Sequence, residues 1–243
     1  MTAIILAAGV GKRLLTASGG KPKCLIQIGG RSLLERLLSQ LARAGVSDAV
    51  VVVGFGADVV RAEIGDGPGG IAVRFIDNPR FREGAILSLW AAEATLSGPV
   101  LVMDADVLCG QTMIDRLVRT AADNCFLLDG RSENTGEEQM LLVRDGYVRN
   151  IVRGGAPGYD LMGESVGFLK LSSAAAQLLR QLLAARIDAG HTGIEHEEVY
   201  PDLLVQTPVG FERVDDLAWT EIDFPDDVTR AERDILPRLN ETA

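Results

Sequence analysis

The sequence predicts an α/β fold, with a Rossmann-like mixed, mostly parallel sheet that carries helices on both faces. In the first half of the chain, runs that are apolar throughout alternate with segments of helical periodicity, which is typical of parallel strands buried on both sides. Glycine or acidic residues follow several of these runs, at the edge where open α/β sheets bind ligands. The chain has 243 residues, 47% of them hydrophobic, and we expect one domain over residues 1–243.

The first half, residues 1–123, is expected to hold four strands and their connecting helices. Apolar, largely β-branched runs predict strands at residues 2–6, 49–53, 71–76 and 99–103. Ser32 and Glu35 have the spacing of a capping box, and the leucines that follow at helical spacing predict a helix that ends at Gly45. Further helices are predicted at residues 58–64 and 86–96.

The second half, residues 124–243, changes to shorter strands joined by glycine- and aspartate-rich turns. Strands are predicted at residues 125–128, 139–143, 147–152, 163–171 and 209–214, and helices at residues 172–188 and 196–205. This half is expected to build the pocket for a second ligand.

The net charge of −10 argues against nucleic acid or an anionic membrane as partner. No apolar run approaches the roughly 18 residues of a membrane helix, and the basic residues near the start follow the apolar run, so we expect a cytoplasmic protein. Cys24, Cys109 and Cys125 lack C-x-x-C spacing and are expected to be reduced packing residues. Cys24 lies beside Lys23 and is a candidate reactive thiol.

A glycine-rich turn follows the first strand, with the sequence LAAGVGKRL over residues 6–14 and KPK over residues 21–23. Small residues let the backbone approach a ligand, and the N–H groups of a tight turn can point at phosphate oxygens. Four basic residues within twelve positions reverse the sign of the chain's charge locally, which favours an anionic ligand. The expected nucleotide-binding residues of this turn are Leu6, Ala7, Ala8, Gly9, Gly11 and Lys12.

Three alternative assignments of this turn fit less well. A strand-to-helix turn without a ligand accounts for an isolated G-x-G about as often. A dinucleotide-binding turn would have a third glycine near Leu14 and an acidic residue at the end of the second strand, which here ends at Gly54. A P-loop would have serine or threonine at the position of Arg13.

Two acidic clusters indicate a metal site. Asp104 and Asp106 follow a buried strand, and strand alternation would put both carboxylates on one side of an extended segment, where oxygen ligands suit Mg²⁺. An isolated D-x-D is more often a solvated turn. The sequence WTEID over residues 219–223, followed by FPDD, adds a second cluster, in which Asp226 and Asp227 are expected to cap a helix.

The glycine turn with its Pro-Lys pair resembles the signature of the nucleotidyltransferase superfamily, which makes NDP-sugars and CDP-alcohols. WTEID is similar to the C-terminal signature of its phosphocholine cytidylyltransferase-like branch. The resemblance implies that Asp106 and Asp223 hold Mg²⁺, that Lys23 bridges the α-phosphate and the acceptor oxygen, and that Arg13 contacts the β- and γ-phosphates. Lys12 and Lys21 are weaker candidates.

The resemblance covers nearly the whole chain and implies a substrate class. Asn78-Pro79, SLW at residues 88–90 and GESVGFLKLS at residues 163–172 look like the branch that acts on small phosphorylated alcohols and phosphonates, usually with CTP. The expected acceptors are 2-hydroxyethylphosphonate, 2-aminoethylphosphonate or phosphocholine, with pyrophosphate released. We expect nucleotide contacts from Asn78, Ser88 and Asp104, and acceptor contacts from Glu164, Glu195 and Glu221. Relatives often have asparagine where this chain has Glu83-Gly84-Ala85.

Several alternatives remain open. A sugar-1-phosphate nucleotidylyltransferase is the nearest rival, a glycosyltransferase also uses D-x-D, and a non-catalytic nucleotide-sensing subunit belongs to another class. EHEE at residues 195–198 could face an amine or a hydroxyl of the acceptor, but such a charge run is more often a solvated helix start. His191 and His196 are expected at the surface. Aromatic residues make up only 5% of the chain, so an aromatic cage for choline is not evident. The sequence does not predict the oligomeric state.

Overall fold

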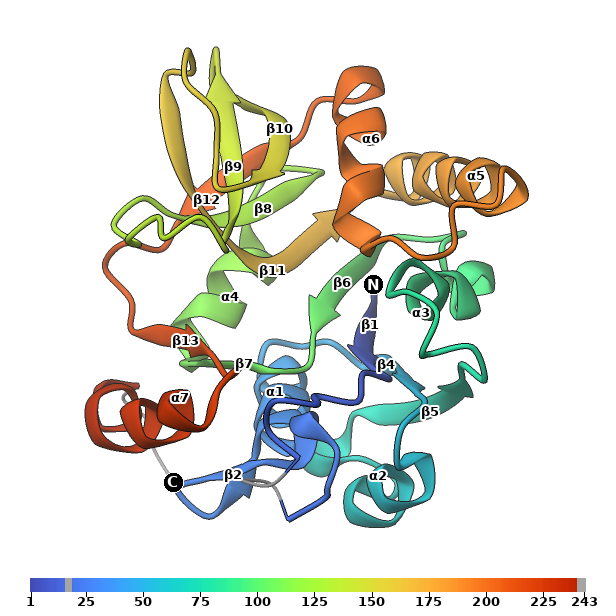
Figure 1. The fold of residues 1–243 in the computed structure, drawn as a ribbon, viewed down its shortest axis with the longest axis vertical. Coiled ribbons are helices and arrows are strands. Elements are labelled where there is room, and N and C mark those ends of the chain that lie inside the picture. Colours follow the sequence, from blue (N-terminus) through green and yellow to red (C-terminus); the bar gives the residue numbers. More distant parts are fainter. Residues whose placement is uncertain (16–18, 240–243) are drawn as a thin grey trace.

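The computed structural model describes residues 1–15 and 19–239. Within them, the main sheet has nine strands, arranged in the order β10-β9-β11-β6-β1-β4-β5, with β8 beside β11 and β12 beside β8 (Figure 1). Its strands are β1 (Thr2–Ala7), β4 (Asp48–Val53), β5 (Ala72–Asp77), β6 (Val100–Asp104), β8 (Cys125–Asp129), β9 (Gln139–Arg144), β10 (Tyr147–Arg153), β11 (Leu161–Leu171) and β12 (Gly210–Arg213).

The two halves of the chain build different parts of this sheet. Strands β6, β1, β4 and β5 are parallel neighbours, and Leu6 of β1 lies opposite Asp104 of β6 and Val52 of β4. Strand β11 runs antiparallel to β6, β8 and β9. The predicted class, a mixed α/β sheet with helices on both faces, is confirmed. The parallel part ends at β6, where the second half of the chain adds its antiparallel strands.

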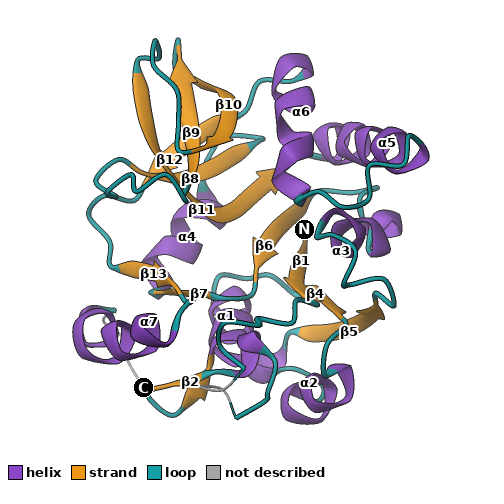
Figure 2. Ribbon diagram, in the orientation of Figure 1, coloured by secondary structure: helices purple, strands orange, loops and turns teal. Residues whose placement is uncertain are grey.

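Helices cover the two faces of the sheet because successive strand residues point to opposite sides. Ile5 packs in a core with α1 (Leu33–Arg43), α2 (Ala57–Ile64) and α4 (Gln111–Arg119), whereas Ile4 packs with α3 (Ile86–Ala91), α5 (Ser173–Asp188) and α6 (Tyr200–Gln206) (Figure 2). Each large apolar side chain buried in these cores contributes roughly 1.5–3 kcal/mol. This burial fixes the sheet edge that carries the candidate site.

Most predicted elements are present, with small shifts at their ends. Ser32 and Ser172 lie just before their helices as N-caps, and their hydroxyls accept hydrogen bonds from the backbone N–H groups of Glu35 and Ala175. The helix predicted over residues 86–96 is α3 followed by the 3₁₀ turn Glu93–Thr95. The helix predicted over residues 196–205 begins as the 3₁₀ turn His196–Val199.

The C-terminal segment folds back onto the N-terminal half. Strand β13 (Trp219–Glu221) pairs antiparallel with β7 (Val107–Cys109), and α7 (Pro225–Arg230) follows. Beside them lies the small hairpin of β2 (Gln27–Ile28) and β3 (Arg31–Ser32), and Leu14, Ile28 and Ile222 share a third apolar cluster. The residues around Asp223 therefore lie beside the loop that follows β1. In the described part of the chain, no helix combines the length and apolarity needed to cross a membrane.

Candidate active site

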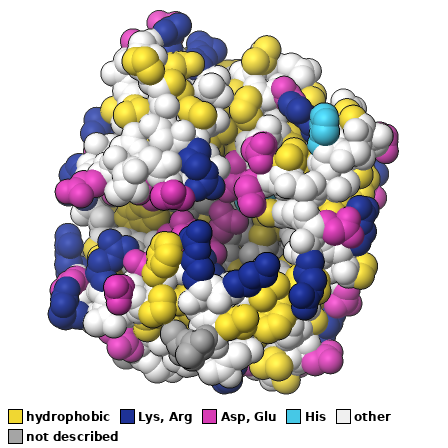
Figure 3. All heavy atoms as spheres, in the orientation of Figure 1, with side chains coloured by type: hydrophobic (Ala, Val, Ile, Leu, Met, Phe, Trp, Pro, Cys, Tyr) yellow, Lys and Arg dark blue, Asp and Glu magenta, His cyan; other side chains and the backbone are white. Residues whose placement is uncertain are grey.

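The turn after β1 forms one wall of a cavity of about 370 Å³. The backbone of Gly11 has a φ of +58°, and a Cβ atom there would lie 3.0 Å from Cβ of Lys23, so glycine suits both the turn and the close approach. Figure 3 shows a hollow in this face of the molecule, with acidic side chains inside it and basic side chains along its lower border. The residues that line the cavity are Val10, Gly11, Lys12, Arg13, Lys23, Phe81, Arg82 and Asp223.

Lys23 lies between carboxylates from two distant parts of the chain. Its Nζ is 2.7 Å from Oδ2 of Asp106, 2.6 Å from Oδ1 of Asp223 and 3.9 Å from Oε1 of Glu221. Burial lowers the pKa of Lys23, but the three carboxylates outweigh it and hold the pKa above its usual value. The ammonium group is therefore charged at neutral pH.

The same three carboxylates have the donor set of a magnesium site. Ligand oxygens of Asp106, Glu221 and Asp223 all lie within 4.8 Å of one another. Oδ1 of Asp106 is buried and has no hydrogen-bond partner among the described residues. Partial desolvation raises the pKa of Glu221, and the charges of Asp106 and Asp223 raise it further. A hard divalent cation would relieve this repulsion, so these residues fit Mg²⁺.

Local structure explains how the two principal carboxylates reach this place. Asp106 lies in the turn between β6 and β7, after the strand has ended at Asp104. Strand β13 ends at Glu221, and Asp223 lies in the loop beyond it. Asp227 accepts hydrogen bonds from the backbone N–H groups of Asp223 and Phe224, so its predicted role as a helix cap is confirmed.

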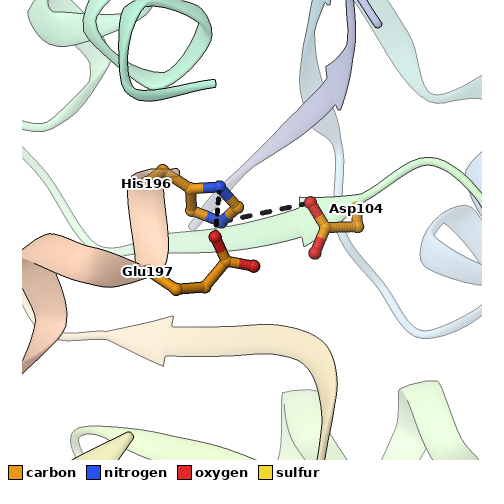
Figure 4. Close-up of side chains that lie close together, drawn as sticks. All are labelled: Asp104, His196 and Glu197. Atoms are coloured by element: carbon orange, nitrogen blue, oxygen red, sulfur yellow. Dashed lines mark ion pairs between the residues drawn. The ribbon is translucent and has the colours of Figure 1, made fainter. Parts of the chain in front are cut away.

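The expectation that Asp104 and Asp106 share one side of an extended segment was wrong. The chain turns immediately after Asp104, which breaks the alternation of the strand. Asp104 instead points toward His196, whose Nε2 is 4.0 Å from its Oδ1 (Figure 4). Nδ1 of His196 lies 3.0 Å from Oε2 of Glu197. The two aspartates therefore belong to separate side-chain clusters.

The expectation that His196 lies at the surface was also wrong, whereas His191 is exposed as predicted. Only 5% of His196 is exposed, and its ring contacts Tyr200 edge-on, with 5.6 Å between ring centres. Burial lowers the pKa of His196, but Glu197 and Asp104 outweigh it and raise the pKa to about 9. The solvated start predicted for residues 195–198 holds only for Glu195 and Glu198, which form a capping box.

Arg13 packs against an aromatic ring that no sequence pattern singled out. Its guanidinium carbon lies 4.7 Å from the centre of the Phe224 ring, which is a cation–π distance. Phe224 is 49% exposed and directly follows Asp223. An exposed aromatic next to an expected metal ligand was the available signal. The segment that supplies Asp223 therefore also holds Arg13.

Asn78 and Ser88 are not among the residues that line the cavity. Both are buried, and Nδ2 of Asn78 donates a 3.0 Å hydrogen bond to Oγ of Ser88. Oδ1 of Asn78 accepts from the backbone N–H of Arg80. These bonds fix the loop that carries Phe81 and Arg82 into the cavity wall. A Cβ atom on Gly84 would lie 2.2 Å from the backbone oxygen of Thr192, so the unusual segment 83–85 packs against the loop before His196.

Two of the acceptor-side candidates, Glu164 and Glu195, are not among the residues that line the cavity beside the glycine turn. Glu164 is in β11 opposite Asp129, which accepts a hydrogen bond from Nε1 of Trp219. Partial desolvation raises the pKa values of both Glu164 and Glu195. Cys24 is buried, and its burial raises the thiol pKa to about 12, so the suggestion that it is reactive was wrong. Cys109 and Cys125 are also buried, and neither forms a disulfide with another described residue.

The chain belongs to the MobA-like NTP transferase domain family, whose profile matches residues 3–194. It is similar to 2-aminoethylphosphonate cytidylyltransferase of Lancefieldella rimae, with 27% identity over 225 residues that cover 91% of this chain and 87% of that protein. It is also similar to mannose-1-phosphate guanylyltransferase of Mycobacterium tuberculosis, with 26% identity over 96% of this chain. The bifunctional IPC transferase and DIPP synthase of Rubrobacter xylanophilus is 30% identical over 96% of this chain.

The chain spans 64% of the length of the guanylyltransferase and 52% of the bifunctional protein. Among solved structures, CTP:phosphocholine cytidylyltransferase from Streptococcus pneumoniae has a TM-score of 0.78 and 22% identity, covering 95% of this chain and 97% of that one. The inositol-1-phosphate CTP transferase from T. maritima has a TM-score of 0.80 and 20% identity, covering 100% and 97%. These two structures share the fold. The predicted membership of the nucleotidyltransferase superfamily is confirmed.

Proposed function

We propose that this chain is a magnesium-dependent cytidylyltransferase that moves CMP from CTP onto a small phosphoalcohol or phosphonate and releases pyrophosphate. The observation that carries the proposal is the position of Lys23. It lies between the carboxylates of Asp106 and Asp223, which could bind a metal, and it also lines a basic cavity beside the glycine turn. A cation at that point faces both the bound triphosphate and the incoming acceptor. The phosphonate-directed relatives support the acceptor class.

The reaction needs alignment and charge neutralisation rather than strong acid or base catalysis. The acceptor oxygen is already anionic at neutral pH, attacks the α-phosphorus, and displaces pyrophosphate. In the proposal, Lys23 contacts the α-phosphate and the acceptor oxygen, where it stabilises the charge that develops in the transition state. Arg13, Lys12 and Arg82 line the cavity and bind the β- and γ-phosphates.

The metal would be held by Asp106 and Asp223, with Glu221 beside them on the acceptor side. When bound, Mg²⁺ supplies charge neutralisation along the triphosphate. The backbone of residues 7–11 approaches the phosphates, and Asn78 and Ser88 fix the neighbouring loop. Residues 1–123 would bind the nucleotide, and residues 124–243 would bind the acceptor through Glu164 and Glu195. Direct contact of Asp104 with the nucleotide stays a prediction.

A sugar-1-phosphate nucleotidylyltransferase is the second candidate. It is favoured by the match to mannose-1-phosphate guanylyltransferase, which covers 96% of this chain. A non-catalytic nucleotide sensor is disfavoured by the geometry, because a protein that only binds nucleotide has no need for Lys23 between two metal-type carboxylates.

The test is pyrophosphate release with Mg²⁺ and each of the four ribonucleoside triphosphates. The acceptors are phosphocholine, 2-aminoethylphosphonate, 2-hydroxyethylphosphonate, glycerol phosphate, inositol phosphate and hexose 1-phosphates. Asp106→Asn serves as the matched control for contaminating activity. Turnover with CTP and a phosphoalcohol or phosphonate supports the proposal. Turnover only with a sugar phosphate supports the second candidate, and tight triphosphate binding without turnover supports a sensor.

A further inference from the structure

A second cavity, of about 470 Å³, lies between the hairpin of β9 and β10 and the turn that starts at His196. It carries three carboxylates and one cation, so its lining has an excess of negative charge. The lining residues are Gln139, Ile151, Val152, Arg153, Glu195, Glu197, Glu198 and Pro201.

The protein neutralises these carboxylates only in part, because His196 and Arg153 supply two cations near three carboxylates. In the part of the chain that the structure describes, none of Glu195, Glu197 and Glu198 forms an ion pair with lysine or arginine. Arg153 is 3.2 Å from Glu137 instead. Glu197 pairs with His196, whose Nδ1 lies 3.0 Å from Oε2 of Glu197 and whose side chain is only 6% exposed. A cavity that keeps this excess of negative charge favours a cationic ligand.

A chain of charged side chains connects this cavity to Lys23. Glu197 contacts His196, and His196 faces Asp104, two residues before Asp106 (Figure 4). The charges of Lys23 and Asp106 both act on the carboxyl group of Asp104. The acidic cavity is thus linked to Asp104 through His196, and it shares no lining residue with the basic cavity of Lys12, Arg13 and Arg82.

We propose that the acceptor carries a primary ammonium group at the end opposite its phosphate or phosphonate, and that Glu197 and Glu195 bind this group. The inference rests on the proposed function and names its substrate class, an aminoalkyl phosphonate or aminoalkyl phosphate. A primary ammonium has three N–H donors for carboxylate oxygens. A quaternary ammonium would instead require aromatic faces, and none of the described residues that line this cavity is aromatic.

The experiment compares acceptors that differ mainly in this group: 2-aminoethylphosphonate, its neutral analogue 2-hydroxyethylphosphonate, and phosphocholine. We expect kcat/KM for the amine to exceed that for the hydroxyl compound by roughly 10- to 100-fold, the range expected for a hydrogen bond to a charged group. Glu197→Gln, or Glu195→Gln if the first variant does not fold, should lower this ratio about tenfold or more. Glu232→Gln is the matched control, because this exposed glutamate lies outside the cavity and should leave the ratio unchanged.

Equal kcat/KM for the amine and the hydroxyl compound would overturn the inference, and so would a preference for phosphocholine. An equal loss with both acceptors in Glu197→Gln would indicate a structural or metal-binding role instead. If no acceptor turns over, the proposed function fails, and calorimetric binding of the two phosphonates decides the inference separately. Tighter binding of the amine that Glu197→Gln weakens supports it, and equal binding of the two compounds contradicts it.

Discussion

Gly167 lies so close to Asp104 that a Cβ atom on it would be 2.5 Å from Oδ2 of the carboxylate. Gly167 also has a φ of +80°, which L-residues with side chains rarely adopt. It lies in β11, the antiparallel neighbour of β6, next to Phe168, which is opposite Met103. Glycine at this point leaves the Asp104 carboxylate the space in which it faces His196.

Gly167→Ala is therefore expected to destabilise the protein for two reasons, backbone strain and displacement of Asp104. Gly146→Ala is the matched control, because Gly146 has a φ of +77° and a Cβ atom on it would meet nothing within 4 Å. We expect the control to cost about 1 kcal/mol from strain alone, and Gly167→Ala to cost at least about 1 kcal/mol more. Urea unfolding of both variants measures this difference. Equal losses in the free energy of unfolding would show that displacing Asp104 does not destabilise the protein.

Lys23 occupies the space between the carboxylates that are proposed to hold the metal. Because its ammonium group competes with a divalent cation for Asp106 and Asp223, Lys23→Gln is expected to bind Mn²⁺ more tightly than the wild type in the absence of nucleotide. A gain of about tenfold, measured by calorimetric or spectroscopic titration of Mn²⁺, corresponds to about 1.4 kcal/mol. Lys12→Gln, in the same cavity but without these contacts, serves as control. Weaker Mn²⁺ binding in Lys23→Gln would contradict this competition.

The same residue is proposed to act mainly on transition-state charge. Lys23→Ala is therefore expected to lower kcat by about 100-fold or more, with a much smaller change in the dissociation constant of the nucleotide. Steady-state kinetics and equilibrium binding of CTP separate these two effects. Equal losses in kcat and in nucleotide binding would mean that Lys23 stabilises the bound nucleotide as much as it stabilises the transition state.

Phe224 is expected to position Arg13 for the phosphates. Phe224→Leu removes the ring face under the guanidinium and should raise KM for the nucleotide about two- to fivefold, in line with roughly 0.5–1 kcal/mol for an exposed cation–π pair. Phe75→Leu is the control, because it removes a similar ring beside Arg61, which does not line the cavity. If both variants keep the wild-type KM, the ring has no part in nucleotide binding.

The buried His196 predicts a specific pH dependence of stability. It faces Asp104 from β6, Glu195 and Glu197 from its own turn, and Tyr200 from α6, and its pKa is raised to about 9. The folded-state pKa lies above the unfolded value of about 6.5. Protonated His196 therefore stabilises the folded protein fully below pH 6.5, and this stabilisation is lost as the pH rises through 9.

We therefore expect the free energy of unfolding of the wild type to fall, relative to that of His196→Gln, by on the order of 2–3 kcal/mol between pH 6 and pH 9.5. Urea unfolding of both proteins at several pH values measures this difference. A difference that stays constant over this range would mean that folding does not raise the pKa of His196, because both states would then bind the same number of protons.

The strands of the parallel half were predictable because their residues are apolar on both sides. Every residue from Ala49 to Val53 is buried, and the sequence of that run has no polar member. The antiparallel direction of β11 was not predictable, because the residue pattern within one strand does not fix the direction of its neighbours. The prediction from side-chain alternation along a strand also failed after Asp104, where a turn replaces the expected extended segment.

The candidate site was predictable where its residues stand in a local pattern. The glycine turn, Lys23 and the two acidic clusters were visible in the sequence, and the structure brings Lys23 within 2.7 Å of both Asp106 and Asp223. The burial of His196 was not visible, since EHEE has the composition of a solvated segment and only packing against Tyr200 and Asp104 removes the ring from water. The contact of Arg13 with Phe224 joins positions that no local pattern connects.

The segment that matches the family ends at residue 194, before His196, Asp223 and Phe224. The short pairing of β13 with β7 is what returns the last two of these to the sheet edge. A homologue can therefore share the whole matched segment and still lack a second carboxylate, the ring under the arginine, or the buried histidine. The proposed metal and acceptor contacts in such proteins are free to diverge through the C-terminal segment, while the strands within residues 3–194 stay the same.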